Sequence, residues 1–205
     1  MVTKAEVIER VSRETCQKLE VYVELLTKWN RAINLVSKST LENVWERHIA
    51  DSLQVMDMAP NSGQWVDLGS GGGLPGLIVA AASSESSRDR QVTLVESDSR
   101  KCAFMAAAAN AMDLDVTIQR RRIEETAAKT YDIISARALA PLSDLLELAL
   151  PYRNEKTVCI FPKGEKADLE MAAAQRNWDV SFDTRQSMTD PLAKIFRIQE
   201  YSRVV

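Results

Sequence analysis

Apolar residues recur at helical spacing in the N-terminal part of the chain, up to residue 58. Two sets follow the pattern of a helix with one buried face: Leu19, Tyr22, Leu26, Trp29 and Ile33, and then Leu41, Val44, Trp45, Ile49, Leu53 and Met56. Capping boxes, in which a hydroxyl and a carboxylate each satisfy a free backbone donor, are predicted at Thr3–Glu6 and Ser39–Glu42. We therefore expect residues 1–60 to form a helical cap.

From residue 61 onward, short apolar runs alternate with helical segments. The predicted strands cover residues 64–68, 92–96, 116–119, 131–135, 157–161, 178–182 and 196–201. The predicted helices begin at residue 75 and cover residues 99–112, 141–150 and 165–175. This alternation predicts a doubly wound α/β domain over residues 61–205, with a mostly parallel seven-stranded sheet covered by helices on both faces. The last two strands follow each other without a helix, so we expect one of them to be antiparallel.

Composition narrows the class of protein. A chain of 205 residues with 45% hydrophobic content is long enough for one α/β domain with an appendage. Its three cysteines and single histidine have no metal-ligand spacing, so we predict reduced thiols and no metal site. Residues 1–7 lack the features of a signal peptide, and the apolar run at 102–109 is too short to span a bilayer, so we expect a cytoplasmic protein without membrane contact. A net charge of −3 argues against non-specific coating of nucleic acid but leaves a local basic site open.

A glycine-rich run, Asp67 to Gly76, lies where the first predicted strand turns into a helix. Ligands of doubly wound sheets bind at such a turn, where glycine permits positive φ and a close approach of the backbone. Glu96 ends the next strand, where its carboxylate is placed to accept hydrogen bonds from two ribose hydroxyls. Together these features indicate an adenosine-containing ligand. The glycines also fit the dinucleotide fingerprint, with Glu96 twenty positions after Gly76, so an NAD-dependent oxidoreductase is an alternative to a methyltransferase.

Five short segments carry a resemblance to a known family: Trp29–Leu35, Arg47–Ser52, Leu74–Gly76, Ile134–Ala138 and Phe161–Gly164. In this order and spacing they resemble the bacterial 16S ribosomal RNA guanine-N(7) methyltransferases, also called the glucose-inhibited division B family. The resemblance implies a class I S-adenosylmethionine-dependent methyltransferase (Rossmann-like) with S-adenosylmethionine as cofactor. It implies transfer of a methyl group to N(7) of a guanosine in a loop of 16S ribosomal RNA. From the acidic charge balance we expect the structured 30S subunit to be a better substrate than free RNA, and we expect the enzyme to be a monomer. A methyltransferase with another RNA or a small-molecule substrate remains an alternative.

The resemblance also implies the residues of a cofactor site. Gly69, Gly71, Gly73 and Leu74 would line the methionine and adenosine pocket, Glu96 would hold the ribose, Ile123 and Glu124 would flank the adenine, and Arg137 would close the site. One departure from the family's pattern is the unbroken glycine triplet at 71–73, where many members have proline or alanine in the middle. It leaves the loop more flexible but removes no contacting group.

Four residues are candidates for the reaction itself: Arg137, Lys163, His48 and Asn34. Arg137 and Lys163 each follow the carboxyl end of a strand, where they are placed to contact the base or phosphates. His48 lies among apolar helical residues, so a structural role in docking the cap competes with catalysis. Asn34 shares a predicted helical face with Asn30, and these amides would contact a base edge or cap the helix end. No general base is needed, because guanine N(7) has an in-plane lone pair.

Overall fold

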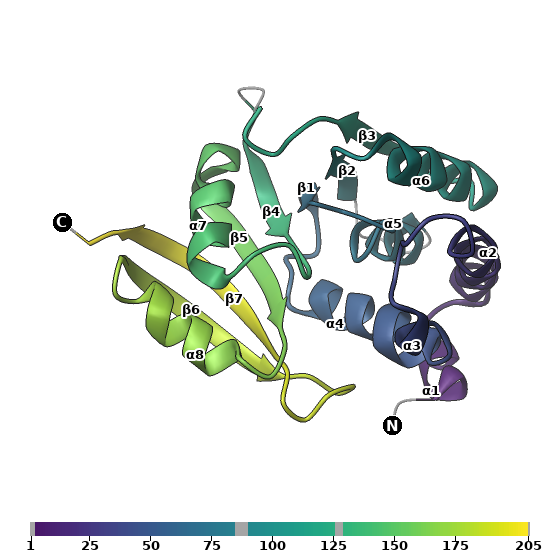
Figure 1. Cartoon of the computed structure of the whole chain (residues 1–205), viewed down its shortest axis with the longest axis horizontal. Coiled ribbons are helices and arrows are strands. Elements are labelled where there is room, and N and C mark those ends of the chain that lie inside the picture. The colour runs from purple at the N-terminus through teal and green to yellow at the C-terminus, as the bar shows by residue number, and fades with distance from the viewer. Residues whose placement is uncertain (1–2, 85–89, 126–128, 205) are drawn as a thin grey trace.

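A computed structural model describes residues 3–84, 90–125 and 129–204, which form a central sheet with helices on both faces (Figure 1). The strands are β1 (Gly63–Leu68), β2 (Arg90–Glu96), β3 (Val116–Arg120), β4 (Tyr131–Ser135), β5 (Arg153–Lys163), β6 (Trp178–Gln186) and β7 (Lys194–Arg203). The helices are α1 (Lys4–Ile8), α2 (Arg13–Trp29), α3 (Lys38–Leu41), the π-helix η1 (Trp45–Ala50), α4 (Asp51–Asp57), α5 (Gly76–Ser84), α6 (Ser99–Ala111), α7 (Leu142–Ala149), the 3₁₀ turn η2 (Leu150–Tyr152) and α8 (Ala167–Ala174). Among the described residues, no helix is long and apolar enough to cross a membrane.

The strand order is β3-β2-β1-β4-β5-β7-β6, and β1 to β5 pair in parallel where they are neighbours. β7 runs antiparallel to both β5 and β6. All seven predicted strands are present, and the prediction that one of the last two is antiparallel is confirmed. The reason is the short connection over residues 187–193, which permits a hairpin but not the crossover that parallel neighbours require.

Each face of the sheet has its own apolar cluster, because successive residues of a strand point to opposite sides. Trp65 and Leu94 pack on the face covered by α2, α4, α5 and α6. Val66 and Val95 pack on the face covered by α7 and α8. α2 contacts α5 and α6, and α4 contacts α5, so the N-terminal helices share one core with the helices of the sheet. The division of the chain at residue 60 stays a prediction.

One of the two capping boxes predicted for the N-terminal helices is present. The capping box at the start of α1 is confirmed, since Thr3 N donates to Glu6 Oε2 at 2.7 Å and Glu6 N donates to Thr3 Oγ1 at 3.3 Å. The capping box predicted at Ser39–Glu42 is wrong. Ser37 is the N-cap of α3 instead, because its Oγ accepts a hydrogen bond from Thr40 N at 3.3 Å.

The apolar positions from residue 41 to residue 56 do not form one continuous α-helix. α3 ends after one turn, and the chain then winds through the π-helix η1 before it continues as α4. A π-helix pairs each N–H with the carbonyl five residues earlier, so it adds about one residue per turn relative to an α-helix. Ile49 and Leu53 are still buried, so the periodicity identifies the buried face correctly while missing the change in winding.

Candidate active site

The loop between β1 and α5, residues 69–75, has glycine at three positions where the backbone is left-handed. Gly69, Gly71 and Gly73 have φ values of 65°, 56° and 77°. A Cβ on Gly73 would lie 2.6 Å from Leu77 Cγ, whereas one on Gly71 would meet nothing closer than the Gly69 carbonyl oxygen at 3.9 Å. The loop is therefore packed against α5 at Gly73 and borders open space at Gly71, as a ligand-binding loop requires.

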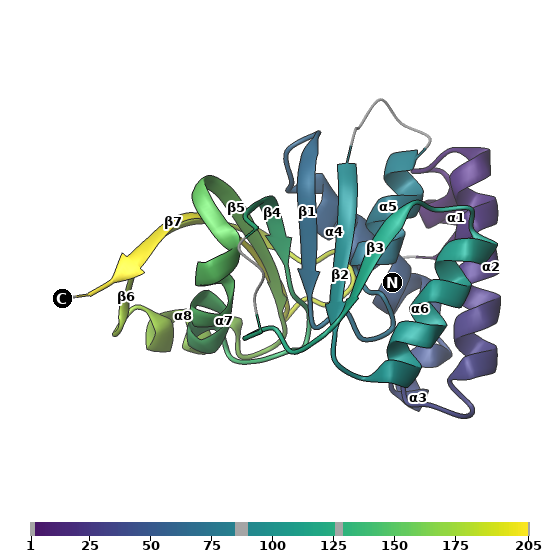
Figure 2. The same ribbon diagram turned by 90° about the horizontal axis from the view of Figure 1, so that it is seen from above.

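Glu96 ends β2 beside this loop, at the edge of the sheet where β1 and β2 finish side by side (Figure 2). Its Oε2 accepts a hydrogen bond from Gly71 N at 3.0 Å, and its Oε1 accepts one from Asp98 N at 2.8 Å. A carboxylate oxygen has more than one lone pair, so both oxygens retain an acceptor site. Glu96 is only 8% exposed and is bonded to Gly71, the loop position where a Cβ would meet open space. This arrangement fits a ribose diol held between Glu96 and the loop.

The buried Asp67 side chain connects the end of the glycine loop to the neighbouring strand β4. Its Oδ1 accepts a hydrogen bond from Ser135 Oγ at 2.7 Å, and its Oδ2 accepts one from Gly76 N at 3.3 Å. Trp65 Nε1 donates to the same Ser135 hydroxyl at 2.8 Å. Burial raises the pKa of Asp67 to about 6, against the opposing effect of these hydrogen bonds. Ser135 and Trp65 were missed from the sequence, because nothing in their spacing indicates that β1 and β4 are neighbours.

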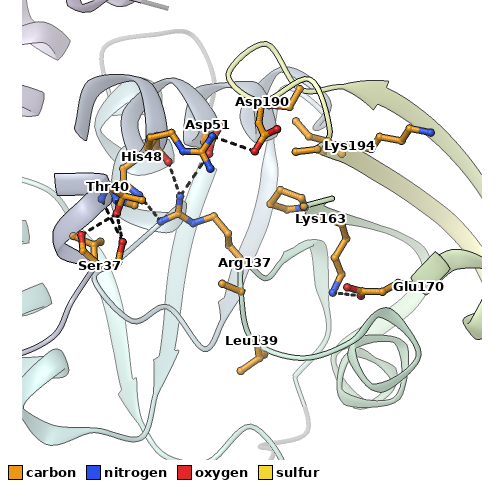
Figure 3. Close-up of a pocket in the computed structure, with 18 of the residues that line it drawn as sticks. Ser37, Thr40, His48, Asp51, Arg137, Leu139, Lys163, Glu170, Asp190 and Lys194 are labelled. Carbon is orange, nitrogen blue, oxygen red and sulfur yellow. Dashed lines mark hydrogen bonds and ion pairs between the residues drawn. The ribbon is translucent and has the colours of Figure 1, made fainter. Parts of the chain in front are cut away.

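A pocket of about 690 Å³ lies beyond the carboxyl ends of β4 and β5. Figure 3 shows the side chains that line it. Its walls come from the segment after α2, from α3, η1 and the start of α4, from the residues after β4 and the end of β5, and from α8, the loop before β7 and the start of β7. Leu139 lines the pocket and also lies against Gly69, since a Cβ on Gly69 would be 2.7 Å from Leu139 Cδ1. Leu139 therefore contacts both the loop that would hold the cofactor and the pocket that would hold a substrate.

Arg137 projects from the segment after β4 into this pocket, and its side chain is 17% exposed. Nη1 donates to the Arg47 carbonyl at 3.2 Å, and Nη2 contacts His48 Nδ1 at 3.1 Å. Asp51 Oδ2 is 3.9 Å from Nη1 and supplies a counter-charge (Figure 3). Burial lowers the pKa of Arg137, but an arginine side chain stays protonated. These hydrogen bonds use two of the five guanidinium donors, so donors remain for a ligand.

His48 is buried, with 6% exposure, and both of its ring nitrogens have partners. Nδ1 lies beside Arg137, and Nε2 is 2.9 Å from Thr40 Oγ1. Burial, followed by the charges of Arg137 and Arg47, lowers the pKa of His48 to about 3, so the ring is neutral at pH 7. Full engagement of the ring favours the structural interpretation of His48 over proton transfer.

Lys163 lines the pocket at the end of β5, but its ammonium group is occupied. Nζ donates to the Ala140 carbonyl at 2.6 Å and pairs with Glu170 Oε2 at 2.7 Å (Figure 3). The same Glu170 oxygen accepts a hydrogen bond from Leu142 N at 2.9 Å. With 8% of its side chain exposed, Lys163 holds the residues after β4 against α8. Its predicted contact with base or phosphate stays a prediction.

Asn34 is exposed in the turn after α2, and the pocket lining does not include it. The expectation that Asn30 and Asn34 share a helical face is wrong, because α2 ends at Trp29. Asn30 instead organises the turn: its Oδ1 accepts hydrogen bonds from Leu35 N at 2.8 Å and Val36 N at 3.0 Å. Neither the predicted cap of the helix end nor a contact with a base edge is seen in these hydrogen bonds, and the base contact stays a prediction.

The remaining predicted cofactor residues lie around the same edge of the sheet. Leu74 is buried within the glycine loop, with 4% exposure. Arg121 N donates to the Glu96 carbonyl at 3.1 Å, which brings the segment after β3 next to Glu96. In that segment Ile123 is buried and its carbonyl accepts a hydrogen bond from Tyr152, while Glu124 is exposed. The described residues contain no group of three or more metal-ligating side chains.

Several solved structures share this fold. A ribosomal protein L11 methylase from Lactobacillus delbrueckii subsp. bulgaricus has a TM-score of 0.56 and 18% identity, covering 77% of both chains. TYW2 from M. jannaschii, in complex with AdoMet, has a TM-score of 0.57 and 13% identity, covering 85% of this chain and 80% of that one. DhpI in complex with SAH has a TM-score of 0.55 and 14% identity over 92% and 98% of the chains. At these identities the likeness shows the fold alone.

The seven-stranded sheet with its glycine loop has the fold of the class I S-adenosylmethionine-dependent methyltransferases. The model of a family described as rRNA small subunit methyltransferase G matches residues 15–195. A relative of that name from Ruegeria sp. (strain TM1040) is 46% identical over 95% of both chains, and one from Jannaschia sp. (strain CCS1) is 48% identical over 93% of this chain and 91% of its own. The chain belongs to this family, which decides against the NAD-dependent alternative.

Proposed function

We propose that this enzyme transfers the methyl group of S-adenosylmethionine to N(7) of a guanosine in a loop of 16S ribosomal RNA. The family match over residues 15–195 carries the proposal, because it spans the glycine loop, the pocket and the N-terminal helices from α2 onward. The relatives it resembles are named for methylation of small-subunit ribosomal RNA. The choice of N(7) of guanine rests on the sequence resemblance and on the chemistry of the pocket.

The pocket is suited to a reaction that requires no general base. Guanine N(7) has an in-plane lone pair, so it can accept a methyl cation equivalent without first losing a proton. His48 is held neutral with both nitrogens bonded, and Lys163 is paired with Glu170, so neither is free to remove a proton. The residues of the site therefore act by positioning and electrostatics.

On the cofactor side, the proposed contacts follow the glycine loop and the ends of the neighbouring strands. S-adenosylmethionine supplies an activated methyl group on sulfur. Glu96 would hold the ribose, Ile123 and Glu124 would flank the adenine, and Gly69, Gly71, Gly73 and Leu74 would line the methionine and adenosine pocket. The open space at Gly71 and the acceptor sites of Glu96 support these assignments.

On the substrate side, a target base must be unstacked, because the deep and narrow major groove of an RNA helix hides N(7). A pocket of about 690 Å³ has room for a purine base and its sugar. The free donors of Arg137 would contact the base or a phosphate, with Lys163 and His48 beside them in the pocket, while Asn34 would contact the RNA from outside the pocket. A net charge of −3 favours a structured particle, the 30S subunit, over free RNA, and we propose that the enzyme acts there as a cytoplasmic monomer.

A transfer assay tests the proposal. The purified chain is incubated with methyl-tritiated S-adenosylmethionine and either small subunits or naked 16S RNA from a strain that lacks the modification. We expect label in the RNA of the subunits, and slower labelling of naked RNA. No label in either substrate would contradict the proposed substrate class, and faster labelling of naked RNA would contradict the assignment to the particle. Calorimetry with NADH serves as the control, since no binding is expected.

A further inference from the structure

We infer that His48 is a positioning residue, whose neutral ring acts as a hydrogen-bond acceptor that holds Arg137 in the pocket, with its tautomer fixed by Thr40. The inference rests on the proposed function only in that Arg137 is taken to act on the substrate. The contact between the two side chains is independent of the reaction. His48 itself lines the pocket behind Arg137 and is not assigned any proton transfer.

The direction of each hydrogen bond follows from the chemistry of the groups. A guanidinium has donors and no acceptor, so His48 Nδ1, 3.1 Å from Arg137 Nη2, must present its lone pair. A neutral imidazole then carries its proton on Nε2, which donates to Thr40 Oγ1 at 2.9 Å. Thr40 Oγ1 donates its own proton to the Ser37 carbonyl at 3.0 Å, so its lone pairs face Nε2 and favour the tautomer that can hold Arg137.

The π-helix η1 presents two acceptors to the same guanidinium. The Arg47 carbonyl accepts from Nη1 at 3.2 Å, and the ring of the next residue, His48, accepts from Nη2. Ser52 Oγ donates to the His48 carbonyl at 2.7 Å and secures the following turn. π-helical turns occur often at functional sites, where the added residue redirects backbone and side-chain groups. Here the turn aims one carbonyl and one ring nitrogen at Arg137.

The surrounding charges require His48 to be neutral. Arg137 faces it from the segment after β4, and Arg47 lies beside it on η1. Asp51 at the start of α4 offsets Arg137, while Asp190, from the loop before β7, pairs with Arg47 at 3.2 Å. A proton on Nδ1 would remove the acceptor and add a third positive charge, so Arg137 would leave its position.

His48 is the only histidine of the chain, so NMR can observe it without assignment by mutation. In the full chain prepared without a histidine tag, long-range ¹H–¹⁵N spectra report the tautomer and the titration of this ring directly. We expect the Nε2–H tautomer and no titration between pH 5 and pH 8. In Arg137→Met the titration should move upward, because one positive neighbour is lost. An Nδ1–H tautomer, or a wild-type ring that titrates near its ordinary value, would overturn the inference.

Two substitutions of His48 separate positioning from simple packing. His48→Asn places an amide oxygen close to the position of Nδ1, whereas His48→Gln places its polar atoms near Nε2. If His48 holds Arg137, His48→Asn should retain methyl transfer within a few-fold, and His48→Gln should lower kcat about tenfold or more with an unchanged KM for S-adenosylmethionine. A purely structural role predicts equal losses in both variants, and that result would overturn the inference.

Thr40→Val provides a variant outside the core in case both His48 variants unfold. It removes the acceptor of Nε2–H while keeping the shape of the side chain, so we expect a mixture of tautomers in the same spectra and a smaller loss of kcat. An unchanged, single tautomer in Thr40→Val would contradict the assigned role of Thr40. If the wild-type enzyme methylates no RNA, the proposed function fails, while the NMR result still decides the contact between His48 and Arg137.

Discussion

The glycine loop and the pocket wall differ in how the chain builds them. The loop is one contiguous segment, and its neighbours Asp67 and Glu96 bind its backbone directly, Asp67 through Gly76 N and Glu96 through Gly71 N. The pocket wall is assembled by side chains from distant parts of the sequence, such as Arg47 with Asp190. The first region is therefore specified by a local motif and the second by long-range contacts. Substitutions should separate the two regions, because cofactor affinity depends on one and substrate positioning on the other.

The largest effect is expected at Glu96, on the loop side. Glu96→Ala removes two proposed charge-assisted hydrogen bonds to the ribose, so the Kd for S-adenosylmethionine should rise about 100-fold. Calorimetry measures this Kd. Glu96→Gln keeps the shape of the side chain and one acceptor, so its Kd should be about tenfold above that of the wild type. Because Glu96 also holds Gly71 N and Asp98 N, thermal melts are needed to show that both variants are folded. A Kd within threefold of wild type in a folded Glu96→Ala would remove the assigned role.

Beneath the loop, Ser135→Ala should reduce stability. The substitution leaves Asp67 Oδ1 and Trp65 Nε1 buried without this hydroxyl partner, so the free energy of unfolding should fall by about 2 kcal/mol. Urea denaturation gives the value. The matched control is Ser143→Ala, which removes a single bond from Trp178 Nε1 and should cost about 1 kcal/mol or less. Equal losses in the two variants would show that the Ser135 hydroxyl has no special role.

Adjacent glycines give a sharper test of the loop. Gly73→Ala places a Cβ at a φ of 77° and against Leu77, so we expect a loss of about 1–2 kcal/mol in stability. Gly72 does not have positive φ, and a Cβ there would find its nearest atom, Leu35 Cβ, at 3.6 Å. Gly72→Ala should therefore be nearly neutral in stability and in cofactor binding. A larger loss of stability in Gly72→Ala than in Gly73→Ala would contradict the described loop geometry.

The pH dependence of stability should distinguish the two regions by its sign. The pKa of Asp67 is raised from 3.8 to about 6, so its contribution is fully present below pH 3.8 and is lost as pH rises through 6. The pKa of His48 is lowered from 6.5 to about 3, so its contribution is present above pH 6.5 and is lost as pH falls. Each slope is at most about 1.4 kcal/mol per pH unit. Relative to wild type, Asp67→Asn and His48→Asn should show opposite slopes between pH 4.5 and pH 6, and parallel slopes would contradict one of the two shifts.

The smallest effect is expected from the ion pair at the pocket rim. Arg47 and Asp190 are 36% and 29% exposed in their side chains, so solvent weakens their attraction. A double-mutant cycle with Arg47→Ala and Asp190→Ala should give a coupling energy of about 0.5 kcal/mol or less. A coupling above about 2 kcal/mol would mean that this contact, and not the sheet, holds the loop before β7.

The features that depend on residues close together in the sequence could be predicted from it. The alternation of apolar runs identifies all seven strands, and the glycine spacing identifies the loop with its left-handed positions. The helices in residues 37–57 were predicted less well, because the switch to π winding at Trp45–Ala50 leaves the apolar periodicity nearly intact. Ser37 and not Ser39 is the cap, which the sequence could not decide because the two serines lie two residues apart and either could begin a helix.

The contacts of the pocket wall could not be predicted from the sequence. His48 was seen as a lone histidine on an apolar face, and Arg137 as a residue beyond a strand. Their contact at 3.1 Å joins positions 89 residues apart and depends on how η1 docks beside β4. Thr40 has no motif that marks it as a partner of His48. Such residues become visible only once the fold places η1 against the end of the sheet.

The measurement that tests the account most directly is the identity of the methylated atom. Small subunits without the modification are treated with the wild-type enzyme and S-adenosylmethionine, and the 16S RNA is then digested and mapped by mass spectrometry. We predict a single new 7-methylguanosine in an unpaired loop, and its loss when Arg137 is replaced by alanine. A methyl group on another atom, on a base-paired guanosine, or on a different RNA would contradict the account.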